Sequence, residues 1–177
     1  KLGDNFYFTQ HDDQWRFRYD GFNGMQPQPG DTYFVDTELA FQIDLDEDGI
    51  VGAKEPTFTE IESIGNISLL TDEDGYVYAQ DQLNNNFEIT FYEEQLQQGM
   101  WGGWNIIAAE NINGLNSVVW KLGDNFYFTQ HDDQWRFRYD GIDGYQPIPG
   151  DVEFNLAELA FDIDLDNDGF IGRPSSV

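Results

Sequence analysis

The chain has 177 residues, with 34 acidic against 8 basic side chains and a formal net charge of −26. This charge excludes nucleic acids as partners, because proteins bind phosphate backbones through lysine and arginine, and it disfavours anionic membranes. A hydrophobic content of 40% is too high for a disordered acidic tail, while no apolar run approaches the ~20 residues of a membrane helix. We therefore expect a folded chain with no membrane insertion. Disulfides and thiolate sites are excluded because the chain has no cysteine.

Part of the sequence occurs twice. Residues 1–52 and 121–172 are identical at 39 of 52 positions, and the first 21 residues recur unchanged. Self-similarity at a fixed period is typical of repeat proteins. We therefore interpret 1–57 as the C-terminal half of one repeat unit and 58–177 as one complete unit. The parent protein is expected to be a tandem array whose neighbouring units are partners.

The pattern between the repeated segments predicts a β-rich unit. Runs of β-branched and aromatic residues are separated by Gly, Asn and Asp, which favour tight turns. The expected strands form a hairpin over 67–80, lie near 88–92, 104–111 and 116–122, and continue through a second hairpin turn at 123–125. Trp135, Phe137 and Tyr139 alternate with arginines, which predicts one more strand. The fold class is therefore mainly β, an antiparallel meander or sandwich-like unit of seven or eight short strands.

One short helix interrupts the strands in each unit. Leu156, Leu159 and Ile163 are spaced i, i+3, i+7, which is the period of an amphipathic helix. Pro-Gly-Asp at 149–151 supplies a start signal. We predict a helix over 152–163 that runs directly into an Asp-rich loop, with the same arrangement in the first copy.

The two Asp-rich loops have the spacing of a calcium site. They read DLDEDGIVG at 44–52 and DLDNDGFIG at 164–172. Asp at positions 1, 3 and 5 brings three carboxylates together, Gly at position 6 permits the sharp turn, and position 7 offers a carbonyl oxygen. The predicted Ca²⁺ ligands are Asp44, Asp46, Asp48 and the Ile50 carbonyl, and Asp164, Asp166, Asp168 and the Phe170 carbonyl. Mg²⁺ fits less well because it keeps several waters. A solvated acidic turn is the alternative that involves no ion.

The twelfth loop position differs between the copies. In a complete EF-hand it is a bidentate Glu. The first copy has Glu55, which we predict to be a ligand, and the second has Ser175, which cannot replace a carboxylate. A proline beside this position in both copies prevents continuation into an exiting helix. Each loop is therefore a dockerin-like half EF-hand. A later strand is the alternative source of the last ligand, with Glu60 and Glu62 as candidates after the first loop.

The motifs occur in an order that resembles a known family. They are IESIGNISLL at 61–70, MWGGWNIIAAENINGLNSVVWK at 100–121, DNFYFTQHDDQWRF at 124–137 and ELAFDIDLDNDGFIG at 158–172. With these segments the chain resembles the tryptophan-rich domain found near the C-termini of secreted cyanobacterial proteins. This resemblance implies a non-enzymatic, repeated, calcium-associated module with a structural or adhesive role. It also implies that the protein is secreted or lies at the cell surface.

Two tryptophans suggest an alternative function. Trp101 and Trp104 flank two glycines, which would leave their ring faces uncovered for stacking on a sugar. A carbohydrate-binding module that recognises surface glycans is therefore the alternative, and packing of both rings in the β core is the competing interpretation. His11 and His131 precede Asp pairs in predicted turns, where we expect exposed imidazoles without a metal or catalytic role. The sequence contains no recognisable nucleophile–base constellation, so we expect no enzyme.

Overall fold

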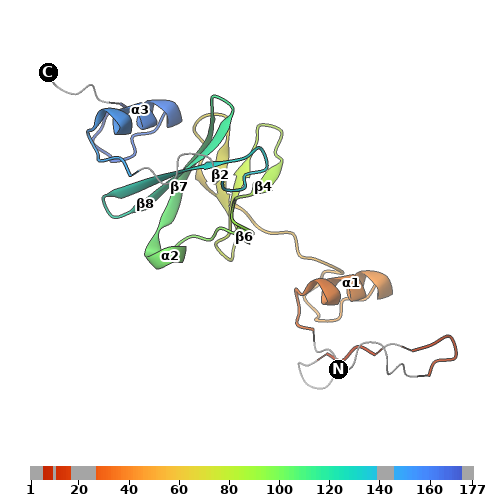
Figure 1. Cartoon of the computed structure of the whole chain (residues 1–177). Coiled ribbons are helices and arrows are strands. Elements are labelled where there is room, and N and C mark those ends of the chain that lie inside the picture. Colours follow the sequence, from red (N-terminus) through yellow and green to blue (C-terminus); the bar gives the residue numbers. More distant parts are fainter. Residues whose placement is uncertain (1–5, 10, 17–26, 139–145, 173–177) are drawn as a thin grey trace. The chain divides into compact units, whose positions relative to one another are not determined.

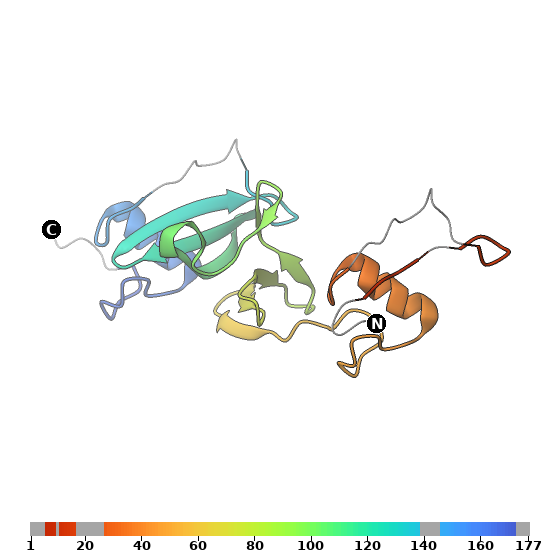
Figure 2. The same cartoon turned by 90° about the horizontal axis from the view of Figure 1, so that it is seen from below.

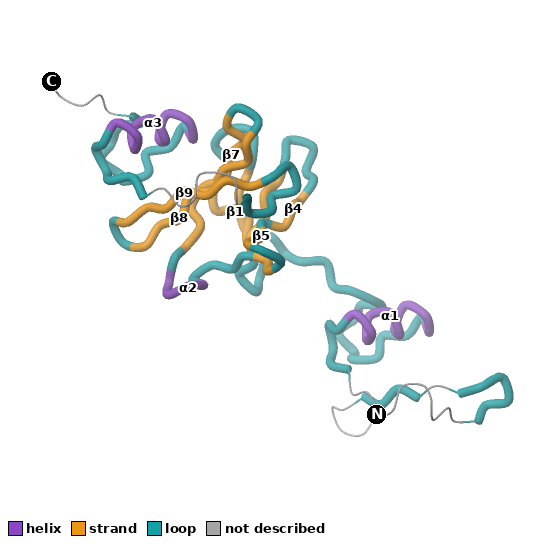
Figure 3. The backbone as a smooth tube through the Cα atoms, viewed as in Figure 1, coloured by secondary structure: helices purple, strands orange, loops and turns teal. Residues whose placement is uncertain are grey.

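The computed structural model describes residues 6–9, 11–16, 27–138 and 146–172. Its contacts divide the chain into two compact units, 1–55 and 56–177. Each unit contains a helix of ten residues that leads into an Asp-rich loop (Figures 1 and 3). No helix among the described residues has the length and apolarity needed to cross a membrane.

The first unit is organised around helix α1, Thr32–Phe41. Phe34 is only 1% exposed, and its ring meets that of Phe6 edge-on with the centroids 4.8 Å apart. Gln42 ends the helix in a left-handed conformation, with φ at 54°. The described residues of this unit contain no strand. Its small core is therefore aromatic packing between α1 and the segment that precedes it.

The second unit is mainly β and antiparallel, which confirms the predicted class (Figure 2). The strands that precede helix α2 are β1 Thr59–Glu62, β2 Ser68–Thr71, β3 Val77–Gln80, β4 Asn86–Glu88, β5 Thr90–Phe91 and β6 Glu94–Gln95. The remaining elements are α2 Met100–Gly103, β7 Asn105–Ile112, β8 Leu115–Leu122, β9 Asn125–His131 and α3 Val152–Phe161. The hairpin over 67–80, the strand pair near 104–122 and the turn before 125 are thus confirmed.

Among the described residues, the strands form three sheets, with orders β1-β2-β3-β4, β5-β6 and β7-β8-β9. Alternate residues of a strand point to opposite faces, so the β7–β9 sheet has two different sides. Val118 and Trp120 lie in a core cluster with Leu69 and Val77 of the β1–β4 sheet. Val119 lies in a second cluster beneath α3, together with phenylalanines of β9 and α3. The β7–β9 sheet is therefore the middle layer between the β1–β4 sheet and α3.

The predicted strand over 135–139 is wrong. Arg136 and Phe137 make only isolated bridges, to Thr90 and His131. The Asp132 carboxylate accepts hydrogen bonds from the backbone N–H groups of Gln134 and Arg136, both at 2.9 Å. This local turn competes with continuation of the strand. Trp135 accordingly has a positive φ of 59°, and Tyr139 lies outside the described residues.

The predicted helix exists but ends two residues early and buries a different face. Asp162 adopts a left-handed conformation after Phe161 and closes α3. Leu156 and Leu159, whose spacing predicted the helix, are 58% and 56% exposed. The buried side chains are those of Phe154, Asn155, Glu158 and Phe161. The apolar spacing therefore found the helix without identifying its core side.

Candidate functional site

Three carboxylates gather at each Asp-rich loop. Glu38, Asp44 and Asp46 each offer an oxygen, and these oxygens lie within 4.8 Å of one another. Glu158, Asp164 and Asp166 form the same group in the second copy. Because Ca²⁺ binds oxygens at 2.3–2.6 Å, two ligands of one ion can be at most about 5 Å apart. Both groups are therefore compact enough to coordinate a single ion.

The loop backbone folds around its aspartates. The Asp44 carboxylate accepts hydrogen bonds from the N–H groups of Glu47 at 2.7 Å and Gly49 at 2.8 Å. Asp48 accepts one from the Ile50 N–H at 2.8 Å. The second copy has the same pattern, with Gly169 N–H donating to Asp164 at 2.8 Å and Phe170 N–H donating to Asp168 at 2.9 Å. Gly49 and Gly169 have φ near +90°, which suits glycine. These bonds orient the first and fifth side chains of each loop.

The helical glutamates Glu38 and Glu158 were not predicted. Both are only 2% exposed. One Glu158 oxygen accepts from Leu165 N–H at 2.9 Å and the other accepts from Gly172 N–H at 3.0 Å. Glu38 binds Leu45 N–H at 2.7 Å and Gly52 N–H at 3.0 Å in the same way. Each carboxylate thus joins the start of its loop to the end, and we call it the loop latch.

A sequence signal for the latch did exist. ELAF occurs at 38–41 and again at 158–161, so the glutamate is repeated although much of the helix around it differs. A buried carboxylate is costly unless it is hydrogen-bonded, and two N–H donors supply that compensation here. The repeat alone could have marked the position, but its burial depends on the tertiary fold.

The electrostatics of the first loop favour a bound cation. Loss of solvent contact is the main cause that raises the pKa of the Asp46 carboxyl, and the charges of Asp48 and Glu38 raise it further. The N–H of Asp48 acts in the opposite direction. Several negative charges therefore lie close together in this loop, and a divalent cation would relieve their repulsion.

The other predicted ligands are less closely grouped. Within the described residues, the two carboxylate groups include neither Asp48 nor Asp168, and Glu55 is an exposed residue outside them. Ile50 and Phe170 are 37% and 54% exposed, so their side chains lie at the surface. Ser175 lies outside the described residues. The third carboxylate of each group comes from the preceding helix, as Glu38 or Glu158, and not from a later segment.

Glu60 and Glu62, the other candidates for the last ligand, belong to β1 of the second unit. Burial is the main cause that raises the pKa of Glu62 to about 7, and the charges of Glu110 and Glu60 add to it. Glu110 is itself only 5% exposed and accepts a hydrogen bond from Asn66 N–H at 2.7 Å. Glu62 therefore belongs to a group of carboxyls at the edge strand β1, and neither of the two carboxylate groups of the loops includes it.

The expectation of an exposed His131 is wrong. The imidazole is 1% exposed, and burial lowers its pKa to about 4. Its Nδ1 lies 3.0 Å from the Trp135 carbonyl oxygen, and its Nε2 lies 3.0 Å from Thr129 Oγ1. A neutral ring satisfies both contacts if Nδ1 donates and Nε2 accepts. His11, its counterpart, is exposed as expected. His131 is therefore a structural residue that holds the turn after β9.

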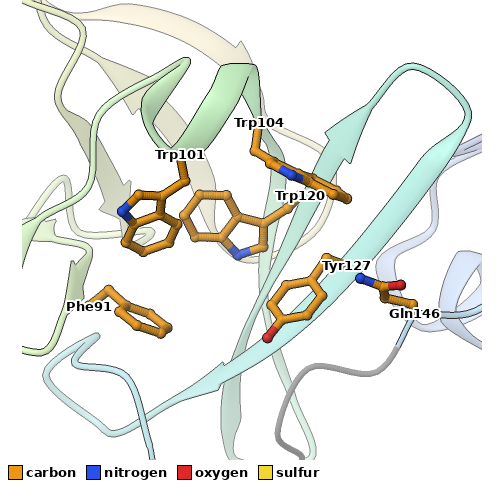
Figure 4. A pocket seen from close by; sticks show the side chains of 6 residues that line it. All are labelled: Phe91, Trp101, Trp104, Trp120, Tyr127 and Gln146. Atoms are coloured by element: carbon orange, nitrogen blue, oxygen red, sulfur yellow. The ribbon is translucent and has the colours of Figure 1, made fainter.

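The predicted tryptophans line an aromatic pocket of about 260 Å³ (Figure 4). Trp101 is 47% exposed and stacks on Trp120, with centroids 5.2 Å apart and planes at 24°. Trp104 is half-buried and meets Tyr127 at 6.2 Å between ring centroids. Phe91 and Gln146 complete the lining. Trp120, the floor of this pocket, was not singled out by the sequence because it reads as an ordinary core residue of a strand.

A comparison with protein families matched residues 67–172, more than half of the chain, to the model of the tryptophan-rich Synechocystis species C-terminal domain. The chain belongs to this family. No curated protein and no solved structure gave a match. The matched segment contains the aromatic pocket, His131 and the second loop with its latch, so these features lie within the tryptophan-rich domain.

Proposed function

We propose that this chain is a non-enzymatic, calcium-stabilised repeat module of a secreted or cell-surface protein, with a structural or adhesive role. The observation that carries the proposal is the pair of carboxylate groups, Glu38–Asp44–Asp46 and Glu158–Asp164–Asp166. In each group the three carboxylates offer oxygens that lie within 4.8 Å of one another. Both groups follow a helix and combine two loop aspartates with a buried helical glutamate. Oxygen-only ligands of this kind suit Ca²⁺, which accepts six to eight of them in flexible geometry.

Calcium would act here as a clasp between helix and loop. The ion would neutralise carboxylates that otherwise repel one another, while the latch holds both ends of the loop to the helix. In the second unit, Lys121 Nζ also donates to the Leu165 carbonyl oxygen at 2.9 Å and thereby ties the loop to β8. Binding to the folded state alone stabilises a protein by mass action. Extracellular calcium modules bind with Kd on the order of 10⁻⁴–10⁻³ M, which suits an exported protein.

The two helices support the proposal that neighbouring repeats are partners. Phe161 of α3 is 2% exposed, because it packs on the β7–β9 sheet in a cluster that includes Val119. Phe41 occupies the equivalent position of α1 and is 68% exposed. The face of α1 that carries Phe41 therefore matches the sheet-binding face of α3. A hairpin with the chemistry of β7–β8, supplied by a neighbouring repeat, would cover it.

Limited proteolysis tests the calcium clasp at the first loop. Lys54 is exposed shortly after this loop, and Lys121 is the other internal lysine. We expect a lysine-specific protease to cleave after Lys54 at least about fivefold more slowly in 5 mM Ca²⁺ than in chelator, with Mg²⁺ much less effective. Asp44→Asn should abolish the difference. Equal cleavage rates in calcium and chelator would contradict the proposal.

The alternative is a carbohydrate-binding module, and the aromatic pocket at Trp101 and Trp104 favours it. The aromatic pocket has ring surfaces on which a sugar face can stack, and Gln146 in its lining offers a hydrogen-bonding side chain. A glycan array with Trp101→Ala and Trp104→Ala as controls tests this function. A glycan signal that both substitutions abolish would support it, and the absence of any signal would remove it.

A further inference from the structure

A second, wider hollow adjoins the aromatic pocket. Phe91 and Trp101 line both hollows, and the second is completed by Tyr92, Glu93 and Glu94. Both glutamates and Tyr92 are exposed. The rings of Phe91 and Trp101 meet edge-on, with centroids 4.7 Å apart. Aromatic faces and carboxylates therefore border the same space.

The backbone fixes Trp101 in its exposed position. Trp101 has φ at 54°, which is unfavourable for a bulky side chain, and such strain concentrates at ligand sites. Gly103 N–H donates to the Gly99 carbonyl oxygen at 3.0 Å, and Gly99 N–H donates to the Trp104 carbonyl oxygen at 3.0 Å. These bonds hold the turn closed around Trp101. The indole is thus presented over Trp120 by a constrained turn.

The chemistry around the rings favours a cation. Aromatic faces attract organic cations, and tryptophan does so most strongly. Glu93 and Glu94 add negative charge beside Phe91 and Trp101, and the whole chain carries −26. An anion would be repelled. A neutral sugar would need several polar partners to replace its water, and among the lining residues of the smaller pocket only Gln146, Tyr127 and the indole N–H groups offer them.

We propose that this aromatic pocket binds a small organic cation, of the quaternary ammonium or methylated amine class. The methyl groups would lie against Trp101, Trp104 and Tyr127. The positive charge would be attracted by the ring faces and, over a longer distance, by Glu93 and Glu94 of the adjoining hollow. A volume of about 260 Å³ is slightly below the usual range of about 300–1,000 Å³ for ligand pockets, which fits a trimethylammonium group better than an oligosaccharide. This site is independent of the calcium loops.

The test compares choline with its uncharged isostere 3,3-dimethylbutan-1-ol, using ligand-observed NMR on the full chain at fixed calcium and ionic strength. We expect saturable binding of choline and at least about tenfold weaker binding of the alcohol. Glu93→Gln with Glu94→Gln should weaken choline binding and leave the alcohol unchanged. Equal affinities for the two ligands, or binding of methyl glycosides in place of choline, would overturn the proposal.

Trp101→Ala supplies the site-specific variant, and Trp15→Ala is its matched control. Trp15 is 85% exposed and has a similar backbone, with φ at 60°, but it belongs to the first unit. Choline binding should fall about tenfold in Trp101→Ala and stay unchanged in Trp15→Ala. If both substitutions changed choline binding equally, choline would be attracted by the acidic chain as a whole. That result would contradict a specific site at Trp101.

Discussion

Substitution Glu158→Gln removes the charge of the loop latch with little change in side-chain volume. Glu158 is 2% exposed, and each of its oxygens accepts one backbone N–H, from Leu165 at 2.9 Å and from Gly172 at 3.0 Å. A hydrogen bond to a charged group contributes about 1.5–3 kcal/mol. Glutamine keeps one acceptor and turns an NH₂ group toward the second N–H. We therefore expect a loss of about 2–4 kcal/mol in excess calcium, or roughly 10 °C in melting temperature.

Thermal unfolding monitored by tryptophan fluorescence measures this loss, because Trp120 and Trp135 lie in the core of the same unit. Glu153→Gln is the matched control, since Glu153 is in the first turn of the same helix and exposed. Its effect should stay below about 1 kcal/mol. The effect of Glu158→Gln should shrink in chelator, because removing one charge relieves repulsion in the empty loop. A melting temperature within 1 °C of the parent in calcium would refute the latch.

Three further predictions concern other buried groups. The pKa of His131 in the folded protein is about 4, below its usual 6.5. Its contribution to the free energy of unfolding is therefore complete above pH 6.5 and is lost as the pH falls through 4. Urea unfolding over this pH range should show a loss of about 3 kcal/mol that is absent in His131→Asn. The pKa of Glu62 in the folded protein is about 7. Its contribution to the free energy of unfolding is therefore fully present below pH 4.5 and is lost as the pH rises through 7. Because this side chain is about half buried, Glu62→Gln should raise the free energy of unfolding at pH 8 by only about 1 kcal/mol. Phe161→Ala should cost about 3–5 kcal/mol and Phe41→Ala less than 1 kcal/mol in the same chain, as measured by denaturant unfolding; equal losses would contradict the difference in burial.

The features that were predictable from the sequence are those encoded over a few neighbouring residues. Turn residues at DEDG and GDN mark the hairpins β2–β3 and β8–β9, and both exist. The spacing of Asp164 and Asp166 likewise places two carboxylates of one group in a single loop. In each case the local backbone preference and the tertiary structure agree, so a pattern is sufficient.

The features that were missed depend on side-chain hydrogen bonds and on burial in the folded chain, which residue spacing alone does not encode. Glu158 looks like a surface residue of an amphipathic helix, yet it is buried because the loop that follows folds back on it. His131 is the last residue of β9 and precedes an Asp-Asp turn, and its buried ring is satisfied by Thr129 Oγ1 and the Trp135 carbonyl oxygen. Trp135 alternates with charged residues as in a strand, but the Asp132 carboxylate binds the backbone and bends the chain there.

A calcium titration by calorimetry on the full chain, with thermal melts in calcium and in chelator, tests the central claim most directly. The two carboxylate groups predict two sites with Kd on the order of 10⁻⁴–10⁻³ M and a clear rise in melting temperature in calcium. Absence of binding heat together with identical melting temperatures in calcium and chelator would contradict a calcium-stabilised module and would leave both loops as solvated acidic turns.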